Sequence, residues 1–245
     1  KYRDSNARVN DLSQITKYQN DKSGSQMISF PTRLSDIYQR LESIAPEKYS
    51  HTRNYVDGAV TYLSPYISRG VISTKTVFNY LLEENYPFET IEKYVQELAW
   101  RDYWQQVWVH KKSAINTDLK SPQQEVQHYE IPTAILTKST NIKAIDVAIQ
   151  ALEDTGYMHN HMRMYAAAAI CNVGKSHWLN PARWMYYHLL DGDWASNALS
   201  WQWVAGSNAS KKYYANQANI NAFFYSDQRN TFLDSDYDVL VNRPC

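Results

Sequence analysis

The sequence predicts an all-α fold, because apolar residues recur at helical spacing in three separate stretches. Residues 34–41 repeat apolar side chains every three or four positions, which places them on one helix face. The longest such signal covers residues 89–112, and a third covers residues 142–152. Gly and Pro are rare, at 7 and 8 residues, and no linker divides the chain. We therefore expect a polar arm at residues 1–30 followed by one helical domain at residues 31–245.

Composition excludes several classes of protein. The chain has 25 basic and 25 acidic residues, whereas a protein that coats duplex DNA would be more basic, so any nucleic-acid site must be a local patch. Cys171 and Cys245 give neither a disulfide framework nor a metal-binding spacing, which favours a reducing compartment. Because there is no run of about 18 apolar residues and no signal peptide, we expect a soluble, cytoplasmic protein.

The first helix is predicted through Leu34, Ile37 and Leu41, with Thr32 or Ser35 as its cap, and its role is structural.

A second helix is predicted to begin near Pro65, because proline suits the first turn of a helix. Thr61 and Ser64 place hydroxyl groups where free backbone N–H groups also point, so the segment can cap the helix or hold a phosphate. The residues alone favour the helix cap.

The long helix at residues 89–112 has two distinct faces. Its buried stripe is predicted at Ile91, Val95 and Leu98. The residues alone favour an ion pair between Glu97 and Arg101 beside core tryptophans. A carboxylate, an arginine and three tryptophans share the second face: Glu97, Trp100, Arg101, Trp104 and Trp108.

Two motifs dominate the second half of the chain. In the first, a loop at Thr155 and Gly156 leads into a helix that carries Arg163 on one face. In the second, Asp191 and Asp193 flank a glycine, so they belong in a turn between helices. Two carboxylates in a turn, with an arginine from another helix, suit a planar ligand that carries both donors and acceptors.

The motifs Thr-Gly-Tyr-Met-His-Asn-x-x-Arg-Met, Asp-Gly-Asp-x-Ala-x-Asn and Trp-Gln-Trp resemble the flavin-binding core of the photolyase/cryptochrome family. They occur in the order and at the spacing of that family, and weaker similarity extends from about Tyr49 to Tyr214. The resemblance implies a helical FAD-binding domain and light-driven repair of pyrimidine dimers in DNA. Full-length members also carry an N-terminal α/β antenna domain, which 30 polar residues cannot supply. We therefore expect a short photolyase-like protein without that domain, or part of a longer chain.

The resemblance also assigns roles around the FAD. Asn197 would face the flavin N5 atom, Arg163 would pair with Asp191 beside the ring, and Asp193 would accept from the ring N3–H. The segment at residues 198–200 departs from the family pattern. The cofactor-binding residues implied are Tyr49, Thr61, Tyr62, Leu63, Ser64, Tyr94, Arg101, Asn160, Arg163, Asp191, Asp193 and Asn197.

Residues implied to act on the substrate lie beside that site. The set that lines the lesion pocket is Glu97, Trp100, Asn160, Met164 and Trp203, and the set that contacts DNA is Arg53, Glu97, Trp100, Arg101 and His161. Asn160 and Met164 match the cyclobutane-dimer type, while His161 replaces an arginine that meets a DNA phosphate. The electron-transfer chain would be Trp201, Trp178 and Tyr129.

The function expected from these features is splitting of cyclobutane pyrimidine dimers by a monomer, with a preference for single-stranded DNA. The neutral charge and the lost arginine favour that preference, because unstacking a base costs little in a single strand. A blue-light photoreceptor without repair activity is the alternative, and a helical binding protein that has lost its flavin is a third. Glu97, Met164 and Asn197 favour repair.

Overall fold

The computed structural model describes residues 28–242, and all of the regular structure there is helical apart from one isolated bridge between His128 and Ser176. The predicted polar arm lies outside the described residues except for its last three positions. The described α-helices, in chain order, are α2 (Leu34–Glu42), α3 (Pro46–Thr52), α4 (Ser64–Ser68), α5 (Thr74–Glu83), α6 (Phe88–Lys111), α7 (Thr133–Leu136), α8 (Lys143–Thr155), α9 (Asn160–Ala168), α10 (Leu179–His188), α11 (Trp194–Ala205), α12 (Gln217–Phe224) and α13 (Tyr237–Val241).

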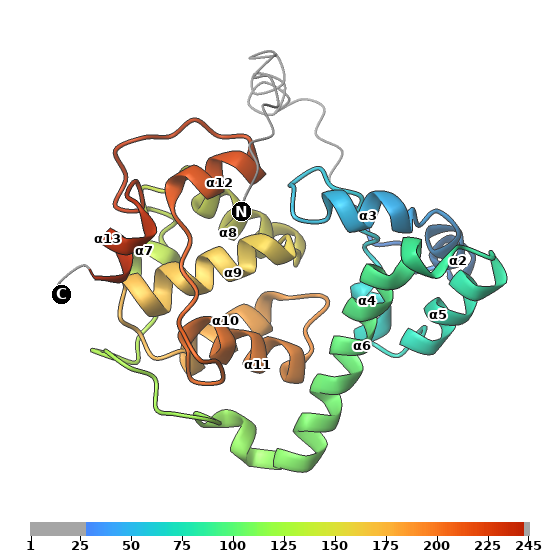
Figure 1. Cartoon of the computed structure of the whole chain (residues 1–245), viewed down its shortest axis with the longest axis horizontal. Helices are drawn as coiled ribbons and strands as arrows, with labels where there is room; N and C mark the ends of the chain where they lie inside the picture. Colours follow the sequence, from blue (N-terminus) through green and yellow to red (C-terminus); the bar gives the residue numbers. More distant parts are fainter. Residues whose placement is uncertain (1–27, 243–245) are drawn as a thin grey trace.

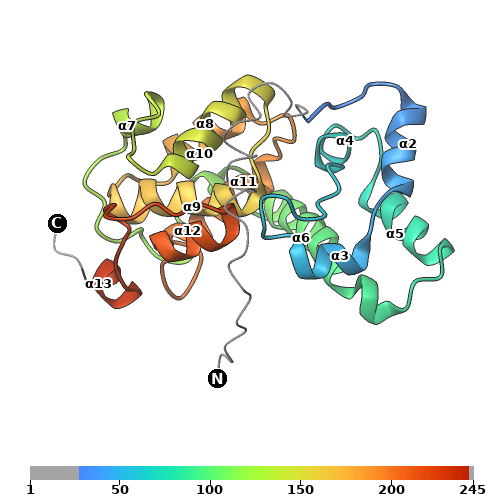
Figure 2. The ribbon, with the colours of Figure 1, turned by 90° about the horizontal axis from the view of Figure 1, so that it is seen from above.

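Helix α6 lies between two groups of helices (Figures 1 and 2). Helices α2 to α5 gather on one side and bury a small cluster that includes Leu41, Val77 and Leu81. Helices α7 to α13 gather on the other side around a larger cluster that includes Ile149 and Trp178. Because α6 packs against α3 and α5 as well as α11, it joins the two clusters into one structure.

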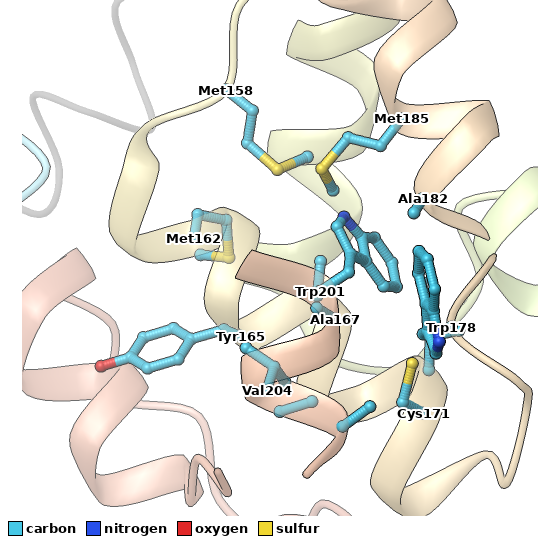
Figure 3. Close-up of a cluster of buried hydrophobic side chains, with 14 of the residues drawn as sticks. Met158, Met162, Tyr165, Ala167, Cys171, Trp178, Ala182, Met185, Trp201 and Val204 are labelled. Carbon is cyan, nitrogen blue, oxygen red and sulfur yellow. The ribbon is translucent and has the colours of Figure 1, made fainter. Parts of the chain in front are cut away.

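The larger cluster is built mainly by α8, α9, α10 and α11 (Figure 3). The alanine-rich second half of α9 allows α11 to pack closely against it. Helix α9 then continues into a π-helical turn, Ala169–Val173, which carries the buried Cys171.

Two predictions about helix ends and faces were wrong. Helix α2 is capped by Arg33 without a side-chain hydrogen bond, not by Thr32 or Ser35. In α6, Tyr94 rather than Val95 completes the buried stripe, since the tyrosine ring packs edge-on against Tyr49 of α3 at 4.7 Å.

Phe30, the last residue of the predicted arm, makes contacts with the helical domain. Phe30 contacts the ring of Tyr62 at 6.4 Å and that of Tyr157 at 5.8 Å, so it belongs to the folded domain rather than to an arm. Cys171 is free, and Cys245 lies outside the described residues. Within residues 28–242, no helix combines the length and the hydropathy needed to cross a bilayer.

Candidate functional site

The two sequence motifs meet at a contact between Gly156 and Leu190. The Leu190 N–H donates to the Gly156 carbonyl at 2.8 Å. Gly156 has φ +72°, and a Cβ atom there would lie 2.5 Å from Cγ of Leu190. Only glycine combines this left-handed conformation with so close an approach. The turn before α9 is therefore held against the turn between α10 and α11.

That contact brings Arg163 and Asp191 together, as the sequence predicted. Nη2 of Arg163 lies 3.0 and 2.9 Å from the two carboxylate oxygens of Asp191, and its Nε donates to the Met158 carbonyl at 2.8 Å. The Asp191 side chain is only 4% exposed and the Arg163 side chain 20%. Burial raises the pKa of Asp191, but the charge and hydrogen bonds of Arg163 outweigh burial and hold it below its ordinary value.

Asp193 connects the same turn to α6. Its Oδ1 accepts from the Ser196 N–H at 3.0 Å and so caps α11. Its Oδ2 accepts from Gln105 at 2.7 Å and from Nη1 of Arg101 at 3.3 Å. Sequence reasoning missed Gln105, although its position four residues after Arg101 places it on the same helix face.

Ser68 of α4 completes this polar network. Its hydroxyl lies 2.8 Å from the carbonyl oxygen of Asp191 and accepts from Nη1 of Arg101 at 3.0 Å. Nothing in the sequence pointed to this residue, because its partners outside α4 lie 33 and 123 positions away. Helices α4, α6 and α9 are thus tied to one turn.

The first turn of α11 presents an amide and a hydroxyl group beside this network. Nδ2 of Asn197 donates to the Ala182 carbonyl at 2.8 Å, which fixes the orientation of the amide. The hydroxyl of Ser196 is buried and has no hydrogen-bond partner within residues 28–242. Because buried hydroxyl groups are nearly always paired, this one is free to bond a polar ligand or a water molecule next to the Arg101–Asp193 pair.

The segment before α4 is held by a tyrosine from α6. The hydroxyl of Tyr94 donates to Oγ1 of Thr61 at 3.3 Å, and burial raises the Tyr94 pKa to about 12. Tyr62 has φ +51°, an uncommon conformation for a side chain of this size, and Leu63 is fully buried. Thr61 therefore lies at a fixed place between α3, α4 and α6, with Ser64 as the first residue of α4.

An aromatic group that the sequence did not predict covers one side of Arg163. The ring of Tyr157 lies 5.8 Å from the Arg163 guanidinium carbon and 5.2 Å from the Tyr62 ring. The Arg40 guanidinium lies 5.5 Å from the ring of Phe30, which also contacts Tyr157. Tyr157 had a signal as the aromatic position of the first motif, and Tyr62 was among the cofactor-binding residues that the resemblance implies, whereas Phe30 and Arg40 had none. The other members meet through contacts distant in sequence.

The residues assigned to the lesion pocket are more exposed than those around Asp191. Trp100 of α6 is 44% exposed and Trp203 of α11 is 42% exposed, and Asn160 at the start of α9 is also exposed. Met164, one turn further along α9, is half-buried. These side chains therefore remain available to a large ligand.

The ion pair predicted between Glu97 and Arg101 does not form. Glu97 instead pairs with Lys93 at 2.8 Å and lies 3.8 Å from Arg53, the residue that follows α3, while Arg101 turns inward to Asp193. The physical reason is burial, because the deeply buried carboxylate of Asp193 requires a positive partner more than the half-exposed Glu97 does.

His161 does not face solvent, so its predicted contact with a DNA phosphate is wrong for this structure. The residue is 8% exposed, its Nδ1 lies 3.0 Å from the Asn54 carbonyl oxygen, and its ring packs against those of Tyr165 and Phe223. Burial lowers its pKa, which favours the neutral ring. The aromatic residues of α9 and α12 hold His161 inside.

Trp201 and Trp178 are both buried members of the larger cluster (Figure 3). Nε1 of Trp178 donates to Oδ1 of Asp118 at 2.8 Å. The ring of His177 lies 5.8 Å from Trp178 and stacks on Tyr129 at 4.9 Å. The structure therefore connects Trp178 to the exposed Tyr129 through His177, a residue to which the sequence assigned no role.

Together these groups fit the flavin that the sequence resemblance implies. A flavin ring carries carbonyl and nitrogen acceptors and one N–H donor. Arg163 offers a cation, Asn197 an oriented amide and Ser196 an unpaired hydroxyl. Asp193 uses three of the roughly four acceptor positions of a carboxylate, which leaves one open on Oδ1.

Comparison with known proteins points in the same direction. Residues 94–234, more than half of the chain, match the family described as the FAD binding domain of DNA photolyase. A deoxyribodipyrimidine photo-lyase from Neurospora crassa is 28% identical over 76% of this chain and 32% of its own length. The enzyme of the same name from Streptomyces griseus is 31% identical over 63% of this chain and 34% of its own length. The chain spans about a third of the length of these curated relatives.

Solved structures confirm the all-α fold. A cryptochrome from Synechocystis superimposes on 80% of this chain and 44% of its own with a TM-score of 0.70, at 22% sequence identity. A class III photolyase from Agrobacterium tumefaciens gives a TM-score of 0.69 over 78% of this chain and 42% of its own, at 23% identity.

Proposed function

Because this chain belongs to the family of FAD-binding domains of DNA photolyases, we propose that it is a light-dependent repair flavoprotein that splits cyclobutane pyrimidine dimers. The observation that carries the proposal is the ion pair between Arg101 of α6 and Asp193 in the turn before α11. Arg101 reaches inward to Asp193, while its neighbour Trp100 stays exposed on α6. A site suited to a flavin and a surface suited to a damaged base thus lie on two sides of one helix turn.

Four residues hold the FAD in this proposal. The Arg163 guanidinium, fixed by Asp191, would neutralise a negative charge on the ring, and Asn197 would face its N5 atom. The open position on Asp193 would accept from the ring N3–H, and the tyrosine-supported segment at Thr61 would hold the diphosphate. When bound in its reduced form, FAD supplies light-driven electron donation, which protein side chains cannot provide.

The substrate is bound by the exposed residues. Glu97 accepts hydrogen bonds from the base edges of the dimer, and Lys93 and Arg53 lie beside this carboxylate. Trp100 and Trp203 pack against its rings, and Asn160 and Met164 line the apolar side between them. The dimer must leave the helix stack to reach these residues.

We infer a preference for single-stranded DNA. The chain has no net charge, and His161, at the position of an arginine in similar proteins, is buried and neutral. Both features weaken electrostatic binding to a duplex. In a duplex, unpairing and unstacking the damaged bases also cost a few kcal/mol. A single strand avoids most of that cost.

The test is repair of a thymine dimer under blue light by the flavin-loaded protein, in single-stranded and in duplex oligonucleotides of the same sequence. We expect dimer loss only under light and faster loss in the single strand. Equal rates for both substrates would reject the strand preference. Bound flavin with no repair of either substrate would reject the photolyase assignment.

The second candidate function is a blue-light photoreceptor without repair activity. The segment after Asn197 favours it, since Ala198, Leu199 and Ser200 depart from the pattern usual in photolyases, and Ala198 and Leu199 are fully buried directly after Asn197. Trp201, Trp178 and Tyr129 would serve either function, because both need electrons delivered to the flavin. Light-dependent reduction of the flavin without dimer loss is the result that this alternative expects.

A further inference from the structure

We propose that Tyr103, with its neighbour Trp100, forms a stacking surface on the outer face of α6 for the bases of single-stranded DNA that flank the lesion. This proposal rests on the proposed function and extends it to a residue outside the lesion pocket. The occupant is a single strand with its base faces free.

The aromatic side chains of α6 form one continuous group of rings. Trp100 stacks on Trp104 with ring centroids 5.0 Å apart, and Tyr103 contacts Trp100 at 5.6 Å and Trp104 at 5.0 Å. Trp104 packs against the larger hydrophobic cluster, which anchors the group. Tyr103 is nonetheless 53% exposed and Trp100 44% exposed. Rings held in place by their neighbours but open to solvent provide a preformed surface for stacking.

The register of α6 directs these rings away from the protein interior. Tyr94, Leu98 and Arg101 face inward and recur at helical spacing along the buried side. Trp100 and Tyr103 are three residues apart, and Tyr103 lies on the far side of the helix from Leu98. The surface therefore begins at the lesion pocket and continues toward the end of α6.

The charges along α6 complement a nucleic-acid strand. C-terminal to Glu97, the only acidic residue of this helix is Asp102, whose carboxylate accepts from Thr74 of α5 at 2.9 Å. The helix ends with His110 and Lys111, followed by Lys112, and all three are exposed. From Tyr103 to Lys111 the axial rise is about 12 Å at about 1.5 Å per residue, enough for a strand of two or three nucleotides.

A single strand fits this arrangement better than a duplex does. Aromatic rings stack on any base whose face is free, and lysines follow the phosphates at the same time. In a duplex the base faces are already stacked on one another, so Tyr103 would contact only the backbone. The surface therefore accounts for strand preference without adding net positive charge to the chain.

The test is binding of an undamaged oligothymidylate in the dark to the flavin-loaded protein, measured by fluorescence anisotropy. We expect Tyr103→Ala to weaken binding about five- to 150-fold, which corresponds to the loss of one base–aromatic stack. Tyr103→Phe keeps the ring and should bind as the unaltered protein does. Tyr187→Ala is the matched control, since this tyrosine of α10 is 83% exposed and also contacts a neighbouring ring.

Three outcomes would overturn the proposal: unchanged affinity in Tyr103→Ala, an equal loss in Tyr187→Ala, or an equal loss of affinity for a duplex of the same sequence. Unchanged affinity for the oligothymidylate would mean that the outer face of α6 contacts a protein segment rather than DNA. Because the measurement needs no light and no dimer, it is independent of repair. If the protein repairs no dimer but Tyr103→Ala still weakens binding of the oligothymidylate, the photolyase assignment is rejected and the stacking surface is retained.

A second variant tests whether Lys111 contacts a phosphate of the bound strand. Lys111→Gln should reduce the dependence of log K on log salt concentration by about 0.7, the value for one phosphate contact on a single strand. An unchanged salt dependence would remove Lys111 from the surface. Circular dichroism spectra that match those of the unaltered protein establish that each variant is folded.

Discussion

Trp178 differs from Trp100 and Trp203 in its burial and in the groups that it contacts. Trp178 is fully buried, and its N–H group donates to Asp118. Trp100 and Trp203 leave more than 40% of their surface to solvent and contact other aromatic rings, those of Trp104 and Tyr213. The same residue type thus lies in the core in one region and at the surface in the other. High aromatic content alone cannot distinguish the two uses, but exposure and hydrogen bonding do.

Removing a buried ring should have the largest effect on stability. Trp178→Ala leaves a cavity in the larger cluster and an unpaired Asp118, so we expect the free energy of unfolding to fall by about 4 kcal/mol. Trp203→Ala should lower it by less than about 1 kcal/mol, because the ring is 42% exposed. Urea denaturation followed by circular dichroism measures both. Similar losses for the two variants would contradict the distinction between core and surface tryptophans.

Buried and exposed ion pairs should also differ in how much they stabilise the fold. Asp191→Asn leaves Arg163 without a negative partner in a largely buried site, and we expect a loss of about 3 kcal/mol. Glu97→Gln removes a half-exposed carboxylate and should cost less than about 0.5 kcal/mol. Because the folded pKa of Asp191 is below its ordinary value, its contribution is present above the unfolded pKa and is lost as the pH falls through the folded value. Urea titrations at neutral and acidic pH measure both effects.

Histidine protonation should have a somewhat smaller effect. His159 is 8% exposed, and its Nδ1 accepts from the His161 N–H at 3.3 Å to cap α9. Burial, together with the charges of His161 and Arg163, lowers its pKa to about 4. Below pH 6.5, the ordinary value, the unfolded chain takes up a proton that the folded chain does not. Stability is therefore complete above that pH and should fall by roughly 2 to 3 kcal/mol as the pH approaches 4.

Histidine variants sharpen this prediction. His159→Asn keeps a side-chain oxygen that can cap α9, so it should remove most of the pH dependence without a large loss at neutral pH. His159→Ala removes both the cap and the titrating group. If the pH dependence of unfolding is the same in His159→Asn as in the unaltered chain, another group causes it.

Tyr129 should have the smallest effect on stability and a clear effect on electron transfer. It is 60% exposed, so Tyr129→Ala should change the free energy of unfolding by less than about 0.5 kcal/mol. If Tyr129 supplies electrons to Trp178 through His177, the variant should slow light-dependent reduction of bound flavin, measured by absorbance. Tyr187→Ala is the control for a general effect of removing an exposed tyrosine. Normal photoreduction in Tyr129→Ala would exclude it as the outer donor.

The positions of some residues could be predicted from the sequence, and those of others could not. The turn at Asp191 followed from the glycine between the two aspartates, and the pairing of Asp191 with Arg163 followed from the family resemblance. The interior position of His161 did not, because its neighbours Phe223 and Phe224 are more than 60 residues away in the chain. The roles of the individual residues toward flavin and DNA stay predictions.

The sequence by itself determined the helices and the residues that its two motifs bring to the site, since helix periodicity and turn chemistry depend on neighbours within a few positions. Only the tertiary structure decided which partner each charged residue takes. Glu97 could pair with Arg101 on the helix surface, but Arg101 turns to Asp193 because a buried carboxylate needs a cation more than an exposed one does. Burial, which sets that need, is a property of the whole fold.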